Sequence, residues 1–324
     1  MRPIVEWHTH VIPPEDTTDP HWKGNCPLTI ENVIDAHEKN DIALSVVTDS
    51  VHQLSGLSKP AALDALKGWH DRAAALQEKY RGKIVCFASS APPGGKDFEK
   101  ELVRAFDDLK LKGVFICSSV WKTYPDEDEA RGFWEIVADR DLPVFIHPPA
   151  SAYGEEKMRN YGLNSSIGRP ADNMLALGRL IVGGIFERHP KLKIVGSHLG
   201  GGISEVIGRM DYAYEMRDQS FLGNYSPLLI KKPPSEYLKM MYLDLACYHL
   251  PAAKCAMETV GVDHVLYGSD APPLTWLKPR AIKLVEDLPV SEEDRAKIFA
   301  GNALKLMNLK KADLPPVLQH YAAA

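Results

Sequence analysis

Residues 4–10, Ile-Val-Glu-Trp-His-Thr-His, begin as a short apolar run and end in two histidines. A run of this kind indicates a strand, which we place at residues 4–7. Side chains two positions apart on an extended backbone point the same way, so His8 and His10 can reach one common ion. The stretch therefore predicts a strand that presents two imidazoles at its carboxyl end.

Similar runs recur along the chain and alternate with amphipathic stretches. Several are apolar throughout, as strands covered on both faces are. The alternation is typical of βα units in a parallel sheet. The other predicted strands are residues 43–48, 84–88, 113–117, 144–147, 194–197, 242–245 and 265–268. The predicted helices are residues 30–40 after the N-cap Thr29, 61–80, 98–109, 129–140, 171–188, 202–217, 251–260, 277–288, and a last one that Ser291 and Asp294 cap, running toward 308.

Eight strands in alternation with helices predict an α/β fold, a (β/α)₈ TIM-type barrel, as one domain over residues 1–324. A doubly wound open sheet has the same alternation, so periodicity leaves the closure of the sheet open. Residues 11–28, 148–170 and 218–239 are too long for tight connections. We expect them to be lid-like insertions, because long ordered loops usually serve binding sites.

Composition narrows the class of protein. The formal net charge is −5 and basic residues are not clustered, which argues against nucleic acid as a partner. No apolar run approaches the roughly 20 residues of a membrane span, and residues 3–7 contain no apolar signal core. The five cysteines form no C-x-x-C pair, which fits a reducing compartment. We therefore expect a cytoplasmic globular enzyme.

Polar residues at the ends of predicted strands carry the functional prediction. They are His8, His10, His147, His198 and Asp270. A lone buried histidine is more often hydrogen-bonded packing than a ligand. In a parallel barrel, however, all carboxyl ends of strands lie on one face, so these five residues would converge there. Neutral imidazoles and a carboxylate suit Zn²⁺, and also Mn²⁺ or Fe²⁺.

Two further histidines, His52 and His249, follow predicted strands and are candidates for lining the pocket. The remaining histidines are predicted to be surface residues: His21, His37, His70, His189, His264 and His320. The glycine run 199–202 lacks the Lys-Ser/Thr pair of a phosphate loop. Its glycines are expected to let the backbone approach a substrate.

Longer motifs resemble a known family. Residues 185–193 (Ile-Phe-Glu-Arg-His-Pro-Lys-Leu-Lys) lead into 197–202 (Ser-His-Leu-Gly-Gly-Gly) and Gly208-Arg209, and residues 263–270 (Asp-His-Val-Leu-Tyr-Gly-Ser-Asp) precede 301–303 (Gly-Asn-Ala). Over nearly its whole length the chain resembles the amidohydrolase-related decarboxylases of the amidohydrolase superfamily, the branch typified by aminocarboxymuconate semialdehyde decarboxylase.

The resemblance implies a barrel that binds one divalent ion, usually zinc, through His8, His10, His147 and Asp270. It implies that His198 is the catalytic histidine that handles the proton of a metal-bound water. We further expect Asp270 to share proton transfer while it binds the metal. Binuclear relatives use a carboxylated lysine on the fourth strand, and residues 113–118 contain no lysine. One metal ion is therefore expected, and a homodimer is common in the family.

The chain also departs from the decarboxylase pattern. Residues 11–28 lack the arginine that binds substrate in that enzyme, and a small residue near Ser165 replaces the expected pocket tryptophan. Arg169 is a candidate to bind a substrate carboxylate from the other side, since guanidinium binds carboxylate through two hydrogen bonds.

Three functions remain open at this point. The leading one is non-oxidative decarboxylation of a small aromatic or unsaturated carboxylic acid. The second is hydrolysis or hydration of a related small carboxylate, lactone or amide by the same site. The third is a barrel with a structural metal, although structural zinc sites tend to be rich in thiolates and no cysteine accompanies these ligands.

Overall fold

The structure is a computed structural model of the 324-residue chain. It describes residues 3–18, 26–49, 51–150, 154–219, 225–272 and 277–322, and among these it does not describe the side chains of residues 17 and 51–53.

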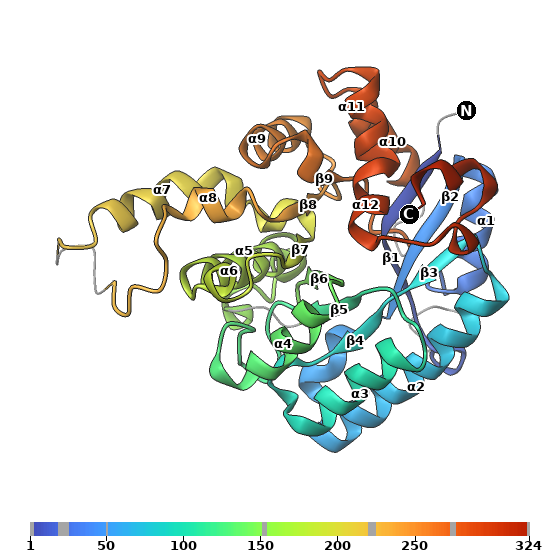
Figure 1. The fold of residues 1–324 in the computed structure, drawn as a ribbon, viewed down its shortest axis with the longest axis horizontal. Helices are drawn as coiled ribbons and strands as arrows, with labels where there is room; N and C mark the ends of the chain where they lie inside the picture. Colours follow the sequence, from blue (N-terminus) through green and yellow to red (C-terminus); the bar gives the residue numbers. More distant parts are fainter. Residues whose placement is uncertain are drawn as a thin grey trace.

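Parallel strands form the centre of the molecule (Figure 1). The described strands are β1 (Ile4–Val11), β2 (Ile42–Asp49), β3 (Ile84–Cys86), β4 (Ala88–Ser90), β5 (Val114–Cys117), β6 (Pro143–His147), β7 (Lys193–Gly196), β8 (Tyr242–Asp244) and β9 (Val265–Leu266). Each strand pairs with the next in chain order, except between β3 and β4. There the single predicted strand is interrupted at Phe87, whose N–H donates to the Val47 carbonyl at 3.1 Å while Ala88 N–H donates to Gly113 at 2.8 Å. The strands β3 and β4 thus act as one barrel strand.

The first strand meets the last. The Trp7 N–H donates to the carbonyl oxygen of Tyr267, just beyond β9, at 3.2 Å. A doubly wound sheet reverses its strand order, whereas these strands follow one another in sequence. The predicted barrel is therefore confirmed, and the open-sheet alternative is wrong.

Helices lie outside the strands (Figure 1). Those described are α1 (Ile30–Asn40), α2 (Lys59–Lys79), α3 (Lys96–Asp107), α4 (Arg131–Asp139), α5 (Arg169–Val182), α6 (Ile185–Arg188), α7 (Ile203–Glu215), α8 (Pro234–Leu238), α9 (Leu250–Val260), α10 (Lys278–Glu286), α11 (Glu292–Ala296) and α12 (Asn302–Met307). Thr29 and Ser291 accept hydrogen bonds from Asn32 N–H and Asp294 N–H, so both predicted caps are confirmed.

Two helix predictions need correction. The predicted helix 171–188 is two helices, because Gly184 adopts a left-handed conformation (φ 72°) that no regular helix tolerates. The list of predicted helices also omits α8, which lies within residues 218–239, predicted only as a lid-like insertion. Its Pro233-Pro234 pair reads as a loop signal, but proline is also favoured in the first turn of a helix.

Alternation along the strands sets the core. On β5 and β6, Val114, Ile116, Val144 and Ile146 pack toward the helices, whereas Phe115 and Phe145 pack inside the barrel. His147 is two residues beyond Phe145 and so continues the inward-facing series at the carboxyl end of β6. The two-residue alternation that places Phe145 inside the barrel therefore also directs the His147 side chain into the barrel mouth.

The prediction of surface histidines is wrong for two residues. His37 is buried and hydrogen-bonds the Ser45 hydroxyl at 2.9 Å. His70 is buried between the Glu101 carboxylate at 2.6 Å and the backbone of Ser89. Both lie on helix faces that pack on the strands, where each ring finds polar partners. His189 and His264 are half-buried, His320 is exposed, and His21 lies outside the described residues.

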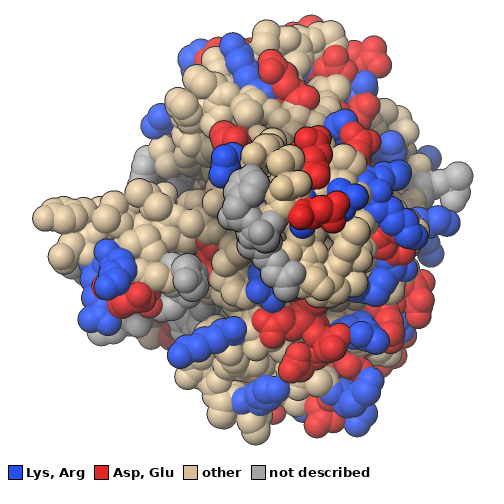
Figure 2. All heavy atoms as spheres, turned by 90° about the vertical axis from the view of Figure 1, so that its left-hand side faces the viewer, with Lys and Arg blue, Asp and Glu red and all other residues tan. Residues whose placement is uncertain are grey.

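On the face drawn in Figure 2, acidic and basic side chains are interspersed without a broad patch of one sign. Among the described residues, every helix is too short or too polar to cross a bilayer.

The buried His37 gives the fold a predicted pH dependence. Burial, reinforced by the charges of Lys278 and Lys83, lowers the pKa of His37 to about 4 from 6.5. Between pH 6.5 and 4, His37 is therefore protonated in the unfolded chain but neutral in the folded chain. The free energy of unfolding decreases as pH falls through this range. Between pH 7.5 and 5, we expect the free energy of unfolding to fall by about 2 kcal/mol more for the native chain than for His37→Gln.

Urea unfolding in the presence of a chelator measures this difference. The exposed His320→Gln variant is the control and should keep the native pH dependence. Identical pH profiles for the native chain and His37→Gln would contradict the prediction.

Candidate metal centre and active site

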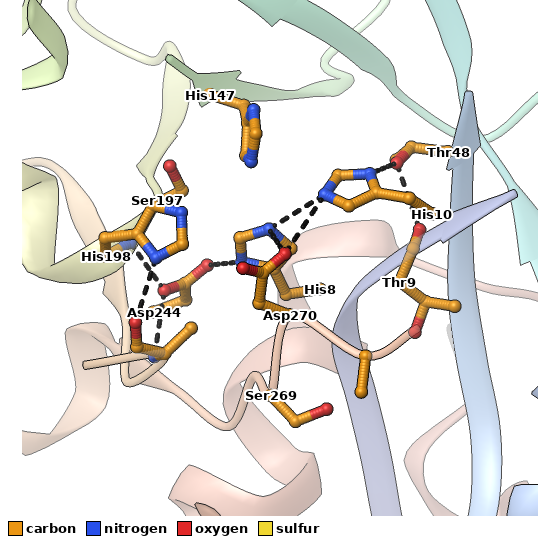
Figure 3. A network of polar contacts seen from close by, with 12 residues as sticks. His8, Thr9, His10, Thr48, His147, Ser197, His198, Asp244, Ser269 and Asp270 are labelled. Atoms are coloured by element: carbon orange, nitrogen blue, oxygen red, sulfur yellow. Dashed lines mark hydrogen bonds and ion pairs between the residues drawn. The ribbon is translucent and has the colours of Figure 1, made fainter. Parts of the chain in front are cut away.

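Four predicted ligands meet at the carboxyl ends of the strands (Figure 3). His8 and His10 come from β1, His147 ends β6, and Asp270 follows β9. One possible ligand atom from each lies within 4.8 Å of the others. His198, which follows β7, lies beside them, its ring centre 5.0 Å from that of His8 and 5.5 Å from that of His147.

A bulge in β1 helps to present both histidines. The pairing register between β1 and β2 shifts between Glu6 and Thr9. As a result the rings of Trp7 and His8 both contact Phe145 inside the barrel, at centroid distances of 5.9 and 5.0 Å. The predicted strand 4–7 is also longer than expected, since β1 continues to Val11, so His8 and His10 lie within the strand rather than after it.

Hydrogen bonds orient the three ligand histidines in the same way. The Nδ1 atom of His8 meets the Asp244 carboxylate at 2.7 Å, that of His10 meets the Thr48 hydroxyl at 2.7 Å, and that of His147 meets the Pro148 carbonyl at 2.9 Å. The Thr48 hydroxyl donates its own proton to the Thr9 carbonyl, so it accepts from His10. Each Nδ1 therefore carries the proton, and each Nε2 presents a lone pair.

The donor set fits a divalent ion. The Nε2 atoms of His8 and His10 lie 3.0 Å apart, and a carboxylate oxygen of Asp270 lies 3.3 Å and 3.6 Å from them. Ligands about 2.1 Å from a shared tetrahedral ion lie roughly 3–4 Å from one another. Two lone pairs facing each other at this distance repel unless a positive charge lies between them. His8, His10, His147 and Asp270 thus form a possible divalent metal site.

The electrostatics of the site favour neutral imidazoles at His10 and His147 beside an ionised carboxylate. Burial lowers the pKa of His10 to about 4 and holds that of His147 well below its usual value. Burial also lowers the pKa of His8, but the charges of Asp244 and Asp270 outweigh it and raise that pKa overall. Burial would raise the pKa of Asp270, yet the neighbouring histidines, His8 above all, hold it below its usual range.

Hydrogen bonds to its surroundings fix the orientation of His198. Its Nδ1 donates to the Ala246 carbonyl at 2.9 Å, which leaves Nε2 with a lone pair. Its N–H donates to Asp244 at 2.8 Å. Burial lowers the pKa of His198, so the ring is neutral near pH 7 and able to accept a proton.

Sequence reasoning missed Asp244. This fully buried carboxylate ends β8 and accepts hydrogen bonds from the His8 ring, from His198 N–H and from Ala246 N–H. It therefore ties a predicted metal ligand to the predicted catalytic histidine. The signal was the same one that singled out Asp270, an acid at the carboxyl end of a predicted strand.

The structure places Arg169 at the start of α5, near the metal site. Its charge contributes to lowering the pKa values of His10 and His147. Burial raises the pKa of the Cys117 thiol, and the charge of Arg169 partly opposes that rise. Its Nε is buried and has no hydrogen-bond partner among the described residues. A guanidinium in this state is suited to an anion brought by a substrate.

The sequence also predicts that His52 and His249 line the pocket. The His52 side chain lies outside the described residues. His249 is the N-cap of α9 and is exposed, and its side chain makes no hydrogen bond with the site residues that the structure describes. Their role in substrate binding stays a prediction.

The glycine run serves a tight turn. His198 and Leu199 have φ of 52° and 57°, and Gly200, Gly201 and Gly202 also have positive φ. A side chain at Gly201 would overlap the carbonyl oxygen of Pro170, the residue after Arg169. In the described structure this glycine lets two backbone segments of the pocket touch each other.

A closed parallel barrel with imidazoles and a carboxylate at its mouth defines a metal-dependent barrel enzyme. The chain belongs to the amidohydrolase family, whose sequence profile matches residues 5–309.

Several known proteins similar to this chain are decarboxylases. The 2-amino-3-carboxymuconate-6-semialdehyde decarboxylase of Dictyostelium discoideum is 27% identical over 274 residues, covering 84% of this chain and 74% of that protein. The structure of 2,6-dihydroxybenzoate decarboxylase complexed with 2,6-dihydroxybenzoate superposes with a TM-score of 0.84 at 19% identity, covering 95% of this chain and 100% of that one. A dihydroxybenzoic acid decarboxylase from Polaromonas, with bound manganese and 2-nitroresorcinol, superposes with a TM-score of 0.81 at 20% identity over 95% and 97% of the two chains.

Asp244 should control metal affinity. Its carboxylate orients His8 and makes that ring a stronger donor, so Asp244→Asn, which keeps the size but removes the charge, should weaken Zn²⁺ binding by about 10- to 100-fold. Competition with a chelating dye at pH 7.5 measures the dissociation constant. The control is Asp263→Asn, a carboxylate 60% exposed that pairs with Lys297 away from the site. Equal affinities for the native chain and Asp244→Asn would contradict the prediction.

Proposed function

We propose that this chain is a metal-dependent, non-oxidative decarboxylase of a small aromatic or unsaturated carboxylic acid. The carrying observation is Arg169, a cationic side chain with a buried, unpartnered Nε beside the ligand cluster. A hydrolase or hydratase needs the same ligands, but a cation facing the substrate carboxylate is what a decarboxylase additionally requires. The decarboxylase activity of the similar proteins supports the same choice.

We propose His8, His10, His147 and Asp270 as the ligands of one divalent ion, with Zn²⁺ as the expected metal and Mn²⁺ or Fe²⁺ as alternatives. Three imidazoles and one carboxylate favour Zn²⁺ chemically, whereas a similar solved structure holds manganese. The ion would act as a Lewis acid that withdraws electron density from a substrate oxygen.

The side chains divide the remaining work. Arg169 would bind the substrate carboxylate through two hydrogen bonds and orient it. His198, neutral and with Nε2 directed by the Ala246 hydrogen bond on its other nitrogen, would take up a proton. The proton that His198 carries comes from solvent. As the C–CO₂ bond breaks, its electron pair stays on the substrate carbon and forms a C–H bond with that proton, so that the products are CO₂ and the substrate with hydrogen in place of its carboxylate. Asp270 could share this proton transfer.

The wider organisation belongs to the same proposal. We expect a single barrel domain whose segments 11–28, 148–170 and 218–239 act as lids that exclude water, and parts of these segments lie outside the described residues. We also expect a homodimer, which light scattering would test.

Release of CO₂ tests the proposed reaction. We expect the purified protein to release CO₂ from at least one member of a panel of hydroxybenzoates and muconate semialdehydes. Removal of metal with a chelator should abolish the activity, and one equivalent of Zn²⁺ or Mn²⁺ per chain should restore it. Ester cleavage or hydration by the metal-loaded protein without CO₂ would instead favour the hydrolase or hydratase.

Arg169 should act mainly on substrate binding. A charge-assisted pair with a carboxylate contributes about 1.5–3 kcal/mol, so Arg169→Met should raise KM by roughly 10- to 100-fold. Arg169→Lys should recover part of that loss, because a lysine keeps the charge but not the two-pronged geometry. Steady-state kinetics measure both variants, and Arg131→Met, which changes an exposed arginine at the start of α4, is the control. An unchanged KM in Arg169→Met would remove Arg169 from the site.

A further inference from the structure

A buried ion pair lies directly behind the ligand cluster. Glu6 on β1 is fully buried and Lys278, the first residue of α10, is 2% exposed. The Lys278 ammonium nitrogen lies 2.7 Å from a Glu6 carboxylate oxygen. Neither residue has a place in the proposed reaction.

The Glu6 carboxylate accepts hydrogen bonds from the backbone at His8 and at Ser269, the residue before Asp270. Its Oε1 accepts from His8 N–H at 3.2 Å and from Ser269 N–H at 2.9 Å, and its Oε2 accepts from the Ser269 hydroxyl at 2.7 Å. His8 is itself a proposed ligand, and Ser269 immediately precedes the ligand Asp270. One carboxylate therefore bridges the first strand of the barrel and the turn after the last.

Lys278 also binds the turn that contains Asp270. Its ammonium donates to the Ser269 hydroxyl at 3.1 Å and to the Ala271 carbonyl at 3.5 Å, so it holds the residues on both sides of Asp270. The Tyr248 hydroxyl also donates to the Ser269 carbonyl.

The turn needs such support because the sheet does not provide it. The strand β9 ends at Leu266, so no strand pairing extends to Asp270. The backbone of Asp270 has a φ of 53°. A residue other than glycine keeps this left-handed conformation when the surrounding structure holds it there. Its ligand oxygen must nevertheless stay within a few tenths of an ångström of one position relative to His8 and His10.

Fold stability alone explains the pair poorly. Removing two charges from water is costly, and well-packed apolar residues often replace a buried ion pair without loss of stability. An apolar pair, however, could not bind Ser269 N–H, the Ser269 hydroxyl and the Ala271 carbonyl.

We propose that the Glu6–Lys278 ion pair is a positioning device that holds Asp270 at ligating distance from His8 and His10, and so sets the affinity of the site for its metal ion. This inference rests on the proposed metal site. It assigns Glu6 and Lys278 no contact with substrate.

The test separates metal binding from folding. We would compare the native chain with Lys278→Met and with the double variant Glu6→Gln/Lys278→Met. For each protein, dye competition measures Zn²⁺ and Mn²⁺ affinity, thermal unfolding of the metal-free chain measures stability, and the visible spectrum of the Co²⁺-loaded chain reports ligand geometry. The control is Lys112→Met, which breaks a partly buried ion pair with Asp313 away from the ligand cluster.

We expect Lys278→Met to lose both stability and metal affinity, because it leaves Glu6 buried without its cation. The double variant should regain the stability but keep an affinity at least about 10-fold below the native value, with an altered Co²⁺ spectrum. Lys112→Met should bind metal like the native chain.

Native affinity and a native Co²⁺ spectrum in the double variant would overturn the proposal and leave the pair a purely structural one. Should the double variant not fold, Ser269→Ala removes the hydroxyl that both charged groups bind, and native affinity in that variant would overturn the proposal equally. Absence of metal binding by the native chain would instead reject the proposed function.

Discussion

The backbone hydrogen bond from Trp7 to Tyr267 joins the first strand of the barrel to the segment that follows the last one. The ligand cluster depends on this closure, because His8 and His10 come from the beginning of the chain and Asp270 from near its end. His147 comes from β6, midway along the strand order, and the parallel direction of the strands brings its side chain to the same rim. The ligands are therefore assembled by the closed sheet as a whole.

Gathering buried imidazoles and carboxylates in one place would be unfavourable without partners for their polar atoms. Here each ligand ring has an acceptor for its Nδ1 proton, and Asp244 serves both His8 and the backbone of His198. These outer contacts fix which nitrogen faces the cluster before any ion arrives. The arrangement lowers the reorganisation needed for binding. The hydrogen bond to Ala246 orients the His198 ring, and burial lowers the pKa of that ring.

Much of this arrangement could be predicted from the sequence. Apolar runs that end in histidine or aspartate predict parallel βα units whose polar ends meet on one face, since the direction of parallel strands determines where their ends lie. Periodicity left the closure of the sheet open, and the choice of four of these residues as ligands followed from the family resemblance. The interruption at Phe87 and the bulge near Glu6 and Trp7 could not be predicted, because both depend on how neighbouring strands fit together. Asp244 carried a readable signal that was overlooked. The buried positions of His37 and His70 depend on partners, Ser45 and Glu101, that lie on other elements.

The close approach of Gly201 to Pro170 has a consequence for how this pocket can diversify. The turn that carries His198 and the helix start that carries Arg169 touch backbone to backbone, with no side chain between them to be trimmed or enlarged. The backbone therefore fixes the distance between His198 and Arg169. Under the proposed function, this distance sets how far the substrate carboxylate lies from the carbon that receives the proton. Bulkier substrates would need additional space elsewhere along the rim. Related chains that share this contact should therefore accept substrates with different ring substituents but with the same spacing between the carboxylate and the carbon that receives the proton.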